Sequence, residues 1–130
     1  MPVTKKKHEC LLCLGSNSNG MTHLQNAEKA LNGIFPAIRW GEIVSTPAEG
    51  NTPCTLPYLN RAAVAYTPMD METVKGILKR IESDNGRTPD SRQTGIVTLD
   101  IDLLKFDNRT LKPEDMEKDY VRRALQSLPR

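Results

Sequence analysis

Two aspartates, Asp100 and Asp102, stand one residue apart in Val97–Leu104, the most strand-like segment of the chain. Side chains alternate across a strand, so both acids share one face, with Cα atoms roughly 6–7 Å apart. Aspartate is uncommon in strands, and two like charges on one face repel each other. Mg²⁺ would remove this repulsion, because it prefers carboxylate oxygens and completes its shell with water and phosphate oxygens. The pair therefore predicts metal-assisted phosphoryl chemistry, with two solvated acids on an exposed strand face as the alternative.

The segments that must position this pair alternate between strand and helix patterns. Apolar residues spaced three and four apart predict one helix from Leu24 to Ile34 and a second from Val74 to Ile81, which Asp70 can cap. Short apolar or alternating runs predict the strands. In chain order these are Glu9–Leu14, Ile38–Thr46, Tyr58–Tyr66 and Ile96–Phe106. Pro113 can open a final helix.

The order β-α-β-β-α-β predicts an α+β protein of the ferredoxin-like class. We expect an antiparallel four-stranded sheet with two helices on one face, followed by a C-terminal helix. At 130 residues the chain is expected to form a single domain, 1–130, with residues 1–8 as a flexible tail.

Composition narrows the function classes. The chain is 38% hydrophobic and 26% charged, and its formal net charge is +2. A charge this close to zero argues against a dedicated surface for duplex nucleic acid. No apolar run approaches the roughly 18 residues of a membrane span. We therefore expect a cytoplasmic monomer that binds neither nucleic acid nor membrane.

The cysteines predict no metal site of their own. Cys10 and Cys13 form a CxxC pattern, but residues three apart in a strand face opposite sides of the sheet. They are expected to be buried thiols. Cys54 falls in a loop without an evident base, so we do not expect a nucleophile there.

Several short segments, taken in order, resemble the hydroxymethyl-dihydropterin pyrophosphokinases. No single segment is specific, whereas all of them at sensible spacing from about Leu11 to Asp107 are. The segments are Leu14-Gly15-Ser16-Asn17, Ser45-Thr46-Pro47, Tyr58-Leu59-Asn60-Arg61-Ala62-Ala63-Val64, Glu82, Gly86-Arg87 and Thr98-Leu99-Asp100-Ile101-Asp102-Leu103-Leu104.

The resemblance implies transfer of pyrophosphate from ATP to the hydroxyl of the hydroxymethyl-dihydropterin in folate biosynthesis, with two Mg²⁺ ions. Asp100 and Asp102 would be the metal ligands, bridging the ions to the phosphates. The residues implied to bind the pterin are Thr46, Pro47, Tyr58, Asn60 and Tyr120. The residues implied to bind the nucleotide are Glu82, Arg87 and Arg92, and Arg87 is also implied in catalysis.

These roles have a physical logic of their own. An amide such as that of Asn60 both donates and accepts, so it can read the edge of a heteroaromatic ring. Aromatic side chains such as Tyr58 and Tyr120 can cover the ring faces. The guanidinium of Arg87 matches phosphate oxygens. The alternatives without a functional role are that Asn60 only packs within its strand and that Arg87 is only exposed to solvent.

The chain departs from the family pattern on the ATP side. The family places Trp-Gly-Pro-Arg before Thr-Leu-Asp, where this chain has Thr94-Gly95-Ile96-Val97. The family's Pro-His after the last strand has no counterpart, and the connection from Asp107 to Met116 is short. We expect a pyrophosphokinase, and two alternatives stay open: a weak or inactive pterin-binding module, and an RNA-binding ferredoxin-like domain. The low aromatic content of 5% argues against the last.

Overall fold

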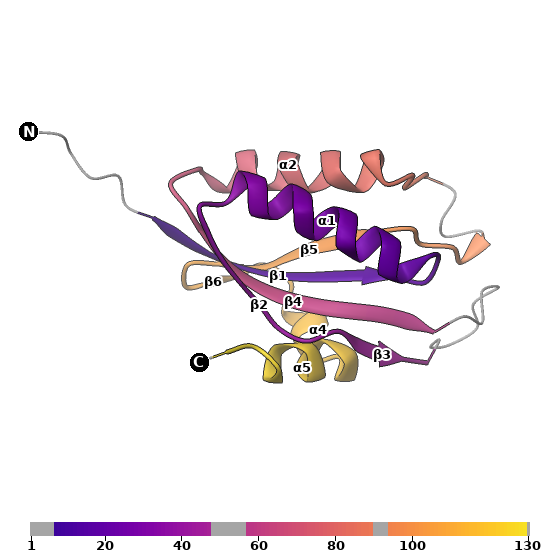
Figure 1. Ribbon diagram of the computed structural model, residues 1–130. Helices are drawn as coiled ribbons and strands as arrows, with labels where there is room; N and C mark the ends of the chain where they lie inside the picture. Colours follow the sequence, from indigo (N-terminus) through magenta and orange to yellow (C-terminus); the bar gives the residue numbers. More distant parts are fainter. Residues whose placement is uncertain (1–6, 48–56, 90–93, 130) are drawn as a thin grey trace, which may run out of the picture.

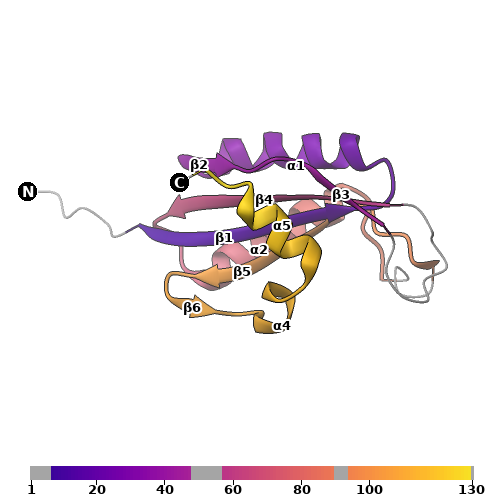
Figure 2. The same ribbon diagram turned by 90° about the horizontal axis from the view of Figure 1, so that it is seen from below.

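The computed structural model describes residues 7–47, 57–89 and 94–129. Its core is an antiparallel sheet with two helices on one face and the C-terminal helices on the other (Figures 1 and 2). The strands are β1 (His8–Ser16), β2 (Ala37–Trp40), β3 (Val44–Thr46), β4 (Tyr58–Thr67), β5 (Asp100–Phe106) and β6 (Arg109–Thr110). The helices are α1 (Gly20–Ile34), α2 (Met71–Asp84), α4 (Pro113–Met116) and α5 (Asp119–Gln126).

The strand order is β2-β4-β1-β5-β6, and β3 also pairs with β4. With β2 and β3 counted as one interrupted strand, this is the antiparallel order of a ferredoxin-like sheet, so the predicted α+β class is confirmed. β1 lies at the centre, between β4 and β5. The start of β5, which carries both aspartates, lies on the side of the sheet that only the two-residue β6 extends.

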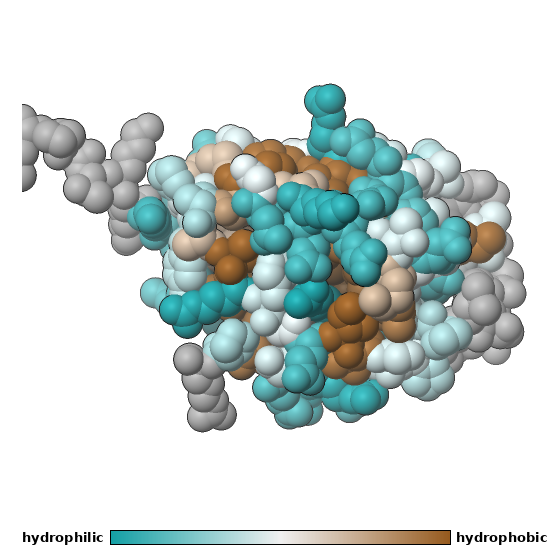
Figure 3. Space-filling model, viewed as in Figure 1, coloured by the Kyte–Doolittle hydropathy of each residue, from teal (hydrophilic) through white to brown (hydrophobic). Residues whose placement is uncertain are grey.

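Helices α1 and α2 form because each has one apolar stripe that the sheet can bury. Leu24, Ala27 and Leu31 point from α1 into the core, and Val74, Leu78 and Ile81 point from α2. The predicted cap of α2 is present, since the Asp70 carboxylate accepts a hydrogen bond of 2.8 Å from the Thr73 amide. In the view of Figure 1, hydrophilic residues cover much of the surface, with hydrophobic patches between them (Figure 3).

A second, smaller core lies on the opposite face, beneath α5. It joins Cys13 and Ala62 of the sheet to Val121 and Ala124 of α5. Cys10 belongs to the larger core under α1 and α2, so the two cysteines lie on opposite faces as predicted. Cys54 lies outside the described residues.

Two predicted elements are interrupted. The strand expected from Ile38 to Thr46 divides into β2 and β3, because residues 41–43 lie opposite only two residues of β4 and form a bulge. Gly41 packs there against the end of α5, where an added Cβ would lie 2.5 Å from the Ser127 hydroxyl. The final helix breaks into α4 and α5 at Lys118, whose backbone is extended and whose ammonium pairs with Asp115 at 2.9 Å.

Two boundaries also differ from expectation. The flexible tail was predicted to include residue 8, but His8 is the first residue of β1. It pairs with Thr67 of β4, and its ring lies 2.7 Å from the Asp107 carboxylate. Residues 1–6 lie outside the described residues. The strand expected from Ile96 begins only at Asp100, since Asn17 already holds the backbone of the preceding residues. In the part of the chain that the structure describes, no helix is long and apolar enough to span a membrane.

Candidate functional site

Asp100 and Asp102 lie where two cavities meet. One cavity, of about 260 Å³, is formed by β1, β3, β4, β5 and the start of α5. The other, of about 570 Å³, lies between α2, β5 and the segment that follows β6. Both aspartates line both cavities, so a group bound at the carboxylates could contact ligands on either side.

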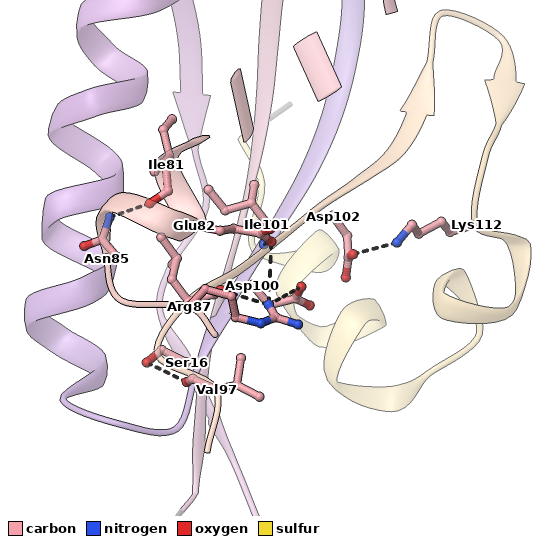
Figure 4. A network of polar contacts seen from close by, with 11 residues as sticks. Ser16, Ile81, Glu82, Asn85, Arg87, Val97, Asp100, Ile101, Asp102 and Lys112 are labelled. Atoms are coloured by element: carbon pink, nitrogen blue, oxygen red, sulfur yellow. Dashed lines mark hydrogen bonds and ion pairs between the residues drawn. The ribbon is translucent and has the colours of Figure 1, made fainter. Parts of the chain in front are cut away.

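Each aspartate is paired with a basic side chain (Figure 4). The Arg87 guanidinium lies 3.1 Å from Asp100 Oδ1, and Lys112 Nζ lies 2.8 Å from Asp102 Oδ1. Arg87 follows α2, whereas Lys112 precedes α4, so the two cations reach β5 from separate segments (Figure 4). These ion pairs reduce the mutual repulsion of the carboxylates.

Negative charge at Asp102 nevertheless remains unfavourable. Burial raises the pKa of the Asp102 carboxyl, and the neighbouring Asp100 charge raises it further, to about 6, although Lys112 opposes the shift. The pKa of Lys112 is itself raised, because the effect of burial, which lowers it, is outweighed by Asp102 and Asp100. The carboxylate pair is therefore short of positive charge at neutral pH.

The residues present fit a divalent cation that is shared with a ligand. Two carboxylates with excess negative charge are suitable Mg²⁺ ligands. Among the described residues, no group of three or more acids, histidines and cysteines forms a complete metal site. Water and the phosphates of a substrate would have to supply the remaining oxygens, which is how Mg²⁺ is usually held in phosphoryl-transfer sites.

The smaller cavity contains the polar and aromatic groups that the sequence singles out. Asn60 is buried, and its amide nitrogen donates a hydrogen bond of 3.0 Å to the Thr46 hydroxyl. Gly15 lies beside it, and a Cβ at this position would lie 3.1 Å from Asn60 Oδ1. Pro47, Tyr58 and Tyr120 complete this set of lining residues. All five residues predicted on the pterin side therefore line one cavity.

The larger cavity contains two of the three residues predicted on the nucleotide side, Glu82 and Arg87. Glu82 Oε2 accepts a hydrogen bond of 2.7 Å from the Ile101 amide and lies 3.7 Å from Arg87. This carboxylate thus joins α2 to the edge of β5 and orients Arg87, a bracing role that the sequence did not predict. Arg92 lies outside the described residues.

The family comparison extends over nearly the whole chain. The sequence model of the 7,8-dihydro-6-hydroxymethylpterin-pyrophosphokinase family matches residues 11–130. The chain belongs to this family. Its members are ATP-dependent pyrophosphokinases, so the predicted family and class of enzyme are confirmed. A comparison with individual curated proteins gave no significant match.

Sequence reasoning also missed the roles of Lys112 and Asn17 at this candidate site. Lys112 contacts Asp102 across ten positions of the chain, and nothing in its local pattern separates it from a solvated lysine. Asn17 uses its side chain twice, donating to the Gly95 carbonyl at 2.7 Å and accepting from the Val97 amide at 2.7 Å. The predicted strand Glu9–Leu14 ended before Asn17, and nothing in the local sequence indicated that this side chain positions the segment entering β5.

Lys118 and Cys13 also line the smaller cavity without having been predicted there. Lys118 Nζ lies 5.8 Å from the centre of the Tyr120 ring, close enough for a cation–π contact. The Cys13 thiol is held in its neutral form, because burial and the charges of Asp102 and Asp100 raise its pKa to about 12. Cys13 therefore contributes a small neutral surface to the cavity wall.

Proposed function

We propose that this protein transfers pyrophosphate from ATP to the hydroxyl of 6-hydroxymethyl-7,8-dihydropterin in a Mg²⁺-dependent reaction. The observation that carries the proposal is the position of Asp100 and Asp102 at the junction of the two cavities. A pterin in the smaller cavity and ATP in the larger one would meet at the carboxylates. The products would be AMP, the pterin diphosphate and one proton.

In this proposal the smaller cavity binds the pterin ring. Its volume of about 260 Å³ lies just below the roughly 300 Å³ at which the usual range of small-molecule sites begins. The rings of Tyr58 and Tyr120 would pack against the flat faces of the heterocycle. Asn60 would read the ring edge, and its link to Thr46 would hold the amide in a fixed orientation. Pro47 would close the rim of the slot.

The larger cavity would bind the nucleotide. Its basic side chains, Lys75, Lys79, Arg87 and Lys112, provide positive charge for a polyphosphate. Arg87 is held near β5 by Asp100 and by the Leu99 carbonyl at 3.0 Å, so it is oriented before the ligand arrives. Arg92 remains a candidate for the same ligand from the family resemblance.

Two Mg²⁺ ions bound to Asp100 and Asp102 would neutralise the phosphate chain and polarise the bond that breaks. The protein's own contribution is to orient the two substrates and exclude water between them. Ion pairs with Arg87 and Lys112 keep the carboxylates in place beforehand, and Glu82 fixes the edge of β5 through the Ile101 amide. Such positioning supplies much of the rate enhancement in phosphoryl transfer.

A pterin-binding module with weak or no turnover is the second candidate. This candidate is favoured by Val97, which occupies the position where the family has an arginine. The Val97 backbone is hydrogen-bonded to Asn17. An aliphatic side chain cannot replace a phosphate-binding arginine, and one such contact can be worth orders of magnitude in rate.

The experiment that separates the candidates is calorimetric binding followed by an AMP-release assay. Hydroxymethyl-dihydropterin and a non-hydrolysable ATP analogue with Mg²⁺ are titrated into wild type and Asp102→Asn. The proposal expects both ligands to bind to wild type, AMP to form, and the variant to lose turnover and metal-dependent nucleotide binding. Pterin binding without AMP at any Mg²⁺ concentration would replace the enzyme with the binding module.

A further inference from the structure

Lys112 differs from the other cation at the carboxylate pair in how it is held. Arg87 donates to the Leu99 carbonyl and Asp100, and also lies 3.7 Å from Glu82, so three acceptors fix its position. Within the described residues, the side chain of Lys112 has a single polar partner, Asp102 at 2.8 Å. Its side chain is 46% exposed, compared with 30% for Arg87. Lys112 can therefore leave its partner by side-chain rotation alone.

The backbone around Lys112 is anchored, whereas its side chain is held only at the ammonium. The Leu111 amide donates to the Leu104 carbonyl at 2.8 Å, which ties the preceding residue to β5. The Lys112 carbonyl accepts from the Met116 amide at 3.2 Å at the start of α4. The Lys112 side chain has several rotatable bonds, so its ammonium can reach different positions along the larger cavity, which Lys112 also lines.

The ammonium and a metal ion would compete for the same carboxylate. Lys112 Nζ donates directly to Asp102 Oδ1, one of the two carboxylate oxygens through which Asp102 could bind Mg²⁺ at about 2.0–2.1 Å. Two positive charges at one partly buried oxygen repel each other strongly. A bound metal would also neutralise the Asp102 carboxylate, which weakens the attraction between this carboxylate and the Lys112 ammonium. Asp115, the nearby acid of the next segment, is already paired with Lys118 at 2.9 Å, so a polyphosphate in the larger cavity would offer the ammonium a new source of negative charge.

We propose that Lys112 is an exchangeable counter-ion: it holds Asp102 in the empty enzyme, gives way to the metal, and then binds the polyphosphate of the nucleotide. This inference rests on the proposed function for the identity of that ligand. It assigns to Lys112 part of the phosphate contact that Val97 cannot make. It also predicts that one side chain weakens metal binding and strengthens nucleotide binding.

The test measures both effects in one variant, Lys112→Met, which keeps the length of the stem and removes the charge. Mn²⁺ binding to the protein without nucleotide is followed by electron paramagnetic resonance, and a non-hydrolysable ATP analogue with saturating Mg²⁺ is titrated by calorimetry. We expect Mn²⁺ to bind about fivefold tighter than to wild type, because a competing ion pair is removed. We expect the ATP analogue to bind about tenfold weaker, because a charged phosphate contact is lost.

Two further variants serve as controls. Lys105→Met removes the same charge three residues along β5 from Asp102, and neither affinity should change by more than about twofold. Lys112→Arg retains a cation and should keep Mn²⁺ affinity near the wild-type value. Should Lys112→Met fail to fold, as judged by its thermal transition, Lys112→Gln takes its place in the same measurements.

The outcomes separate this inference from the proposed function. Unchanged or weaker Mn²⁺ binding in Lys112→Met, or an equal shift in Lys105→Met, overturns the counter-ion exchange even if the wild type releases AMP. Tighter Mn²⁺ with unchanged binding of the ATP analogue overturns the phosphate half of the proposal. Absence of AMP release by the wild type overturns the proposed function, while the Mn²⁺ comparison still decides whether Lys112 competes with the metal.

Discussion

Replacing Asp102 with asparagine should stabilise the protein while removing its function. Asparagine has nearly the shape of a protonated aspartic acid, and it carries no charge. The pKa of the Asp102 carboxyl is raised from 3.8 to about 6, with burial as the largest cause and the Asp100 charge as the second. At 1.36 kcal/mol per pKa unit, a shift of about two units corresponds to about 3 kcal/mol. The side chain is only 21% exposed, so solvent screens little of this.

The sign follows from linkage between protonation and folding. Because the folded-state pKa lies above the unfolded value, protonation of Asp102 favours the folded state. That stabilisation is fully present below pH 3.8 and is lost as the pH rises through about 6. The neutral amide of the variant does not titrate, so it cannot lose this stabilisation. The free energy of unfolding of Asp102→Asn should therefore equal that of wild type near pH 4 and exceed it by up to about 3 kcal/mol at pH 8.

Urea unfolding followed by fluorescence of Trp40, the single tryptophan, measures this difference at a series of pH values without metal. Asp70→Asn is a control of opposite sign. Hydrogen bonds from the Thr73 side chain and from the Thr73 amide hold the pKa of the Asp70 carboxyl below its usual value, so that carboxylate favours folding at high pH. A difference for Asp102→Asn that does not vary with pH, or a variant less stable than wild type at pH 8, would refute the reasoning.

Three further predictions concern the same site. The affinity of the wild type for Mg²⁺, measured by calorimetry with the ATP analogue present, should fall as the pH is lowered through about 6. The reason is that the proton taken up by Asp102 competes with the metal for the carboxylate. An affinity that does not change between pH 5 and 8 would argue against Asp102 as a ligand. Asn60→Leu should lower the free energy of unfolding in urea by about 1–3 kcal/mol, because the buried Thr46 hydroxyl loses its hydrogen-bond partner. It should also abolish pterin binding in a fluorescence titration. Retained binding would show that Asn60 is not part of the pterin site. Gly15→Ala should weaken pterin binding roughly tenfold, because the new methyl would lie 3.1 Å from Asn60 Oδ1 and displace the amide. An unchanged affinity would show that the orientation of Asn60 does not matter.

Local patterns predicted the features of this fold that depend on local chemistry. Apolar residues at helical spacing located α1 and α2, because each helix must bury one stripe. Strand alternation placed Asp100 and Asp102 on one face and separated Cys10 from Cys13.

Features that depend on contacts between distant segments were not predictable in this way. The bulge at Gly41 exists because α5 packs there, more than eighty residues along the chain. The start of β5 is delayed to Asp100 because Asn17, far upstream, holds Val97 by its backbone. Lys112 is recognisable only once the fold has brought it to Asp102. In each case the deciding partner is set by topology, and no periodicity in the sequence reports it.

The position of the acidic pair in the sheet bears on why this site can join two substrates. β5 pairs with β1 on one side, and on the other side β6 pairs only with its last two residues, 105 and 106. Asp100 and Asp102 therefore lie on a stretch of strand that leaves room for a cavity beyond the sheet, while their side chains also face the cavity under α5. The central strand β1, by contrast, is paired with β4 on one side and β5 on the other, and its residues line only the smaller cavity. The destabilising charge at Asp102 is thus a consequence of the location that the proposed reaction requires.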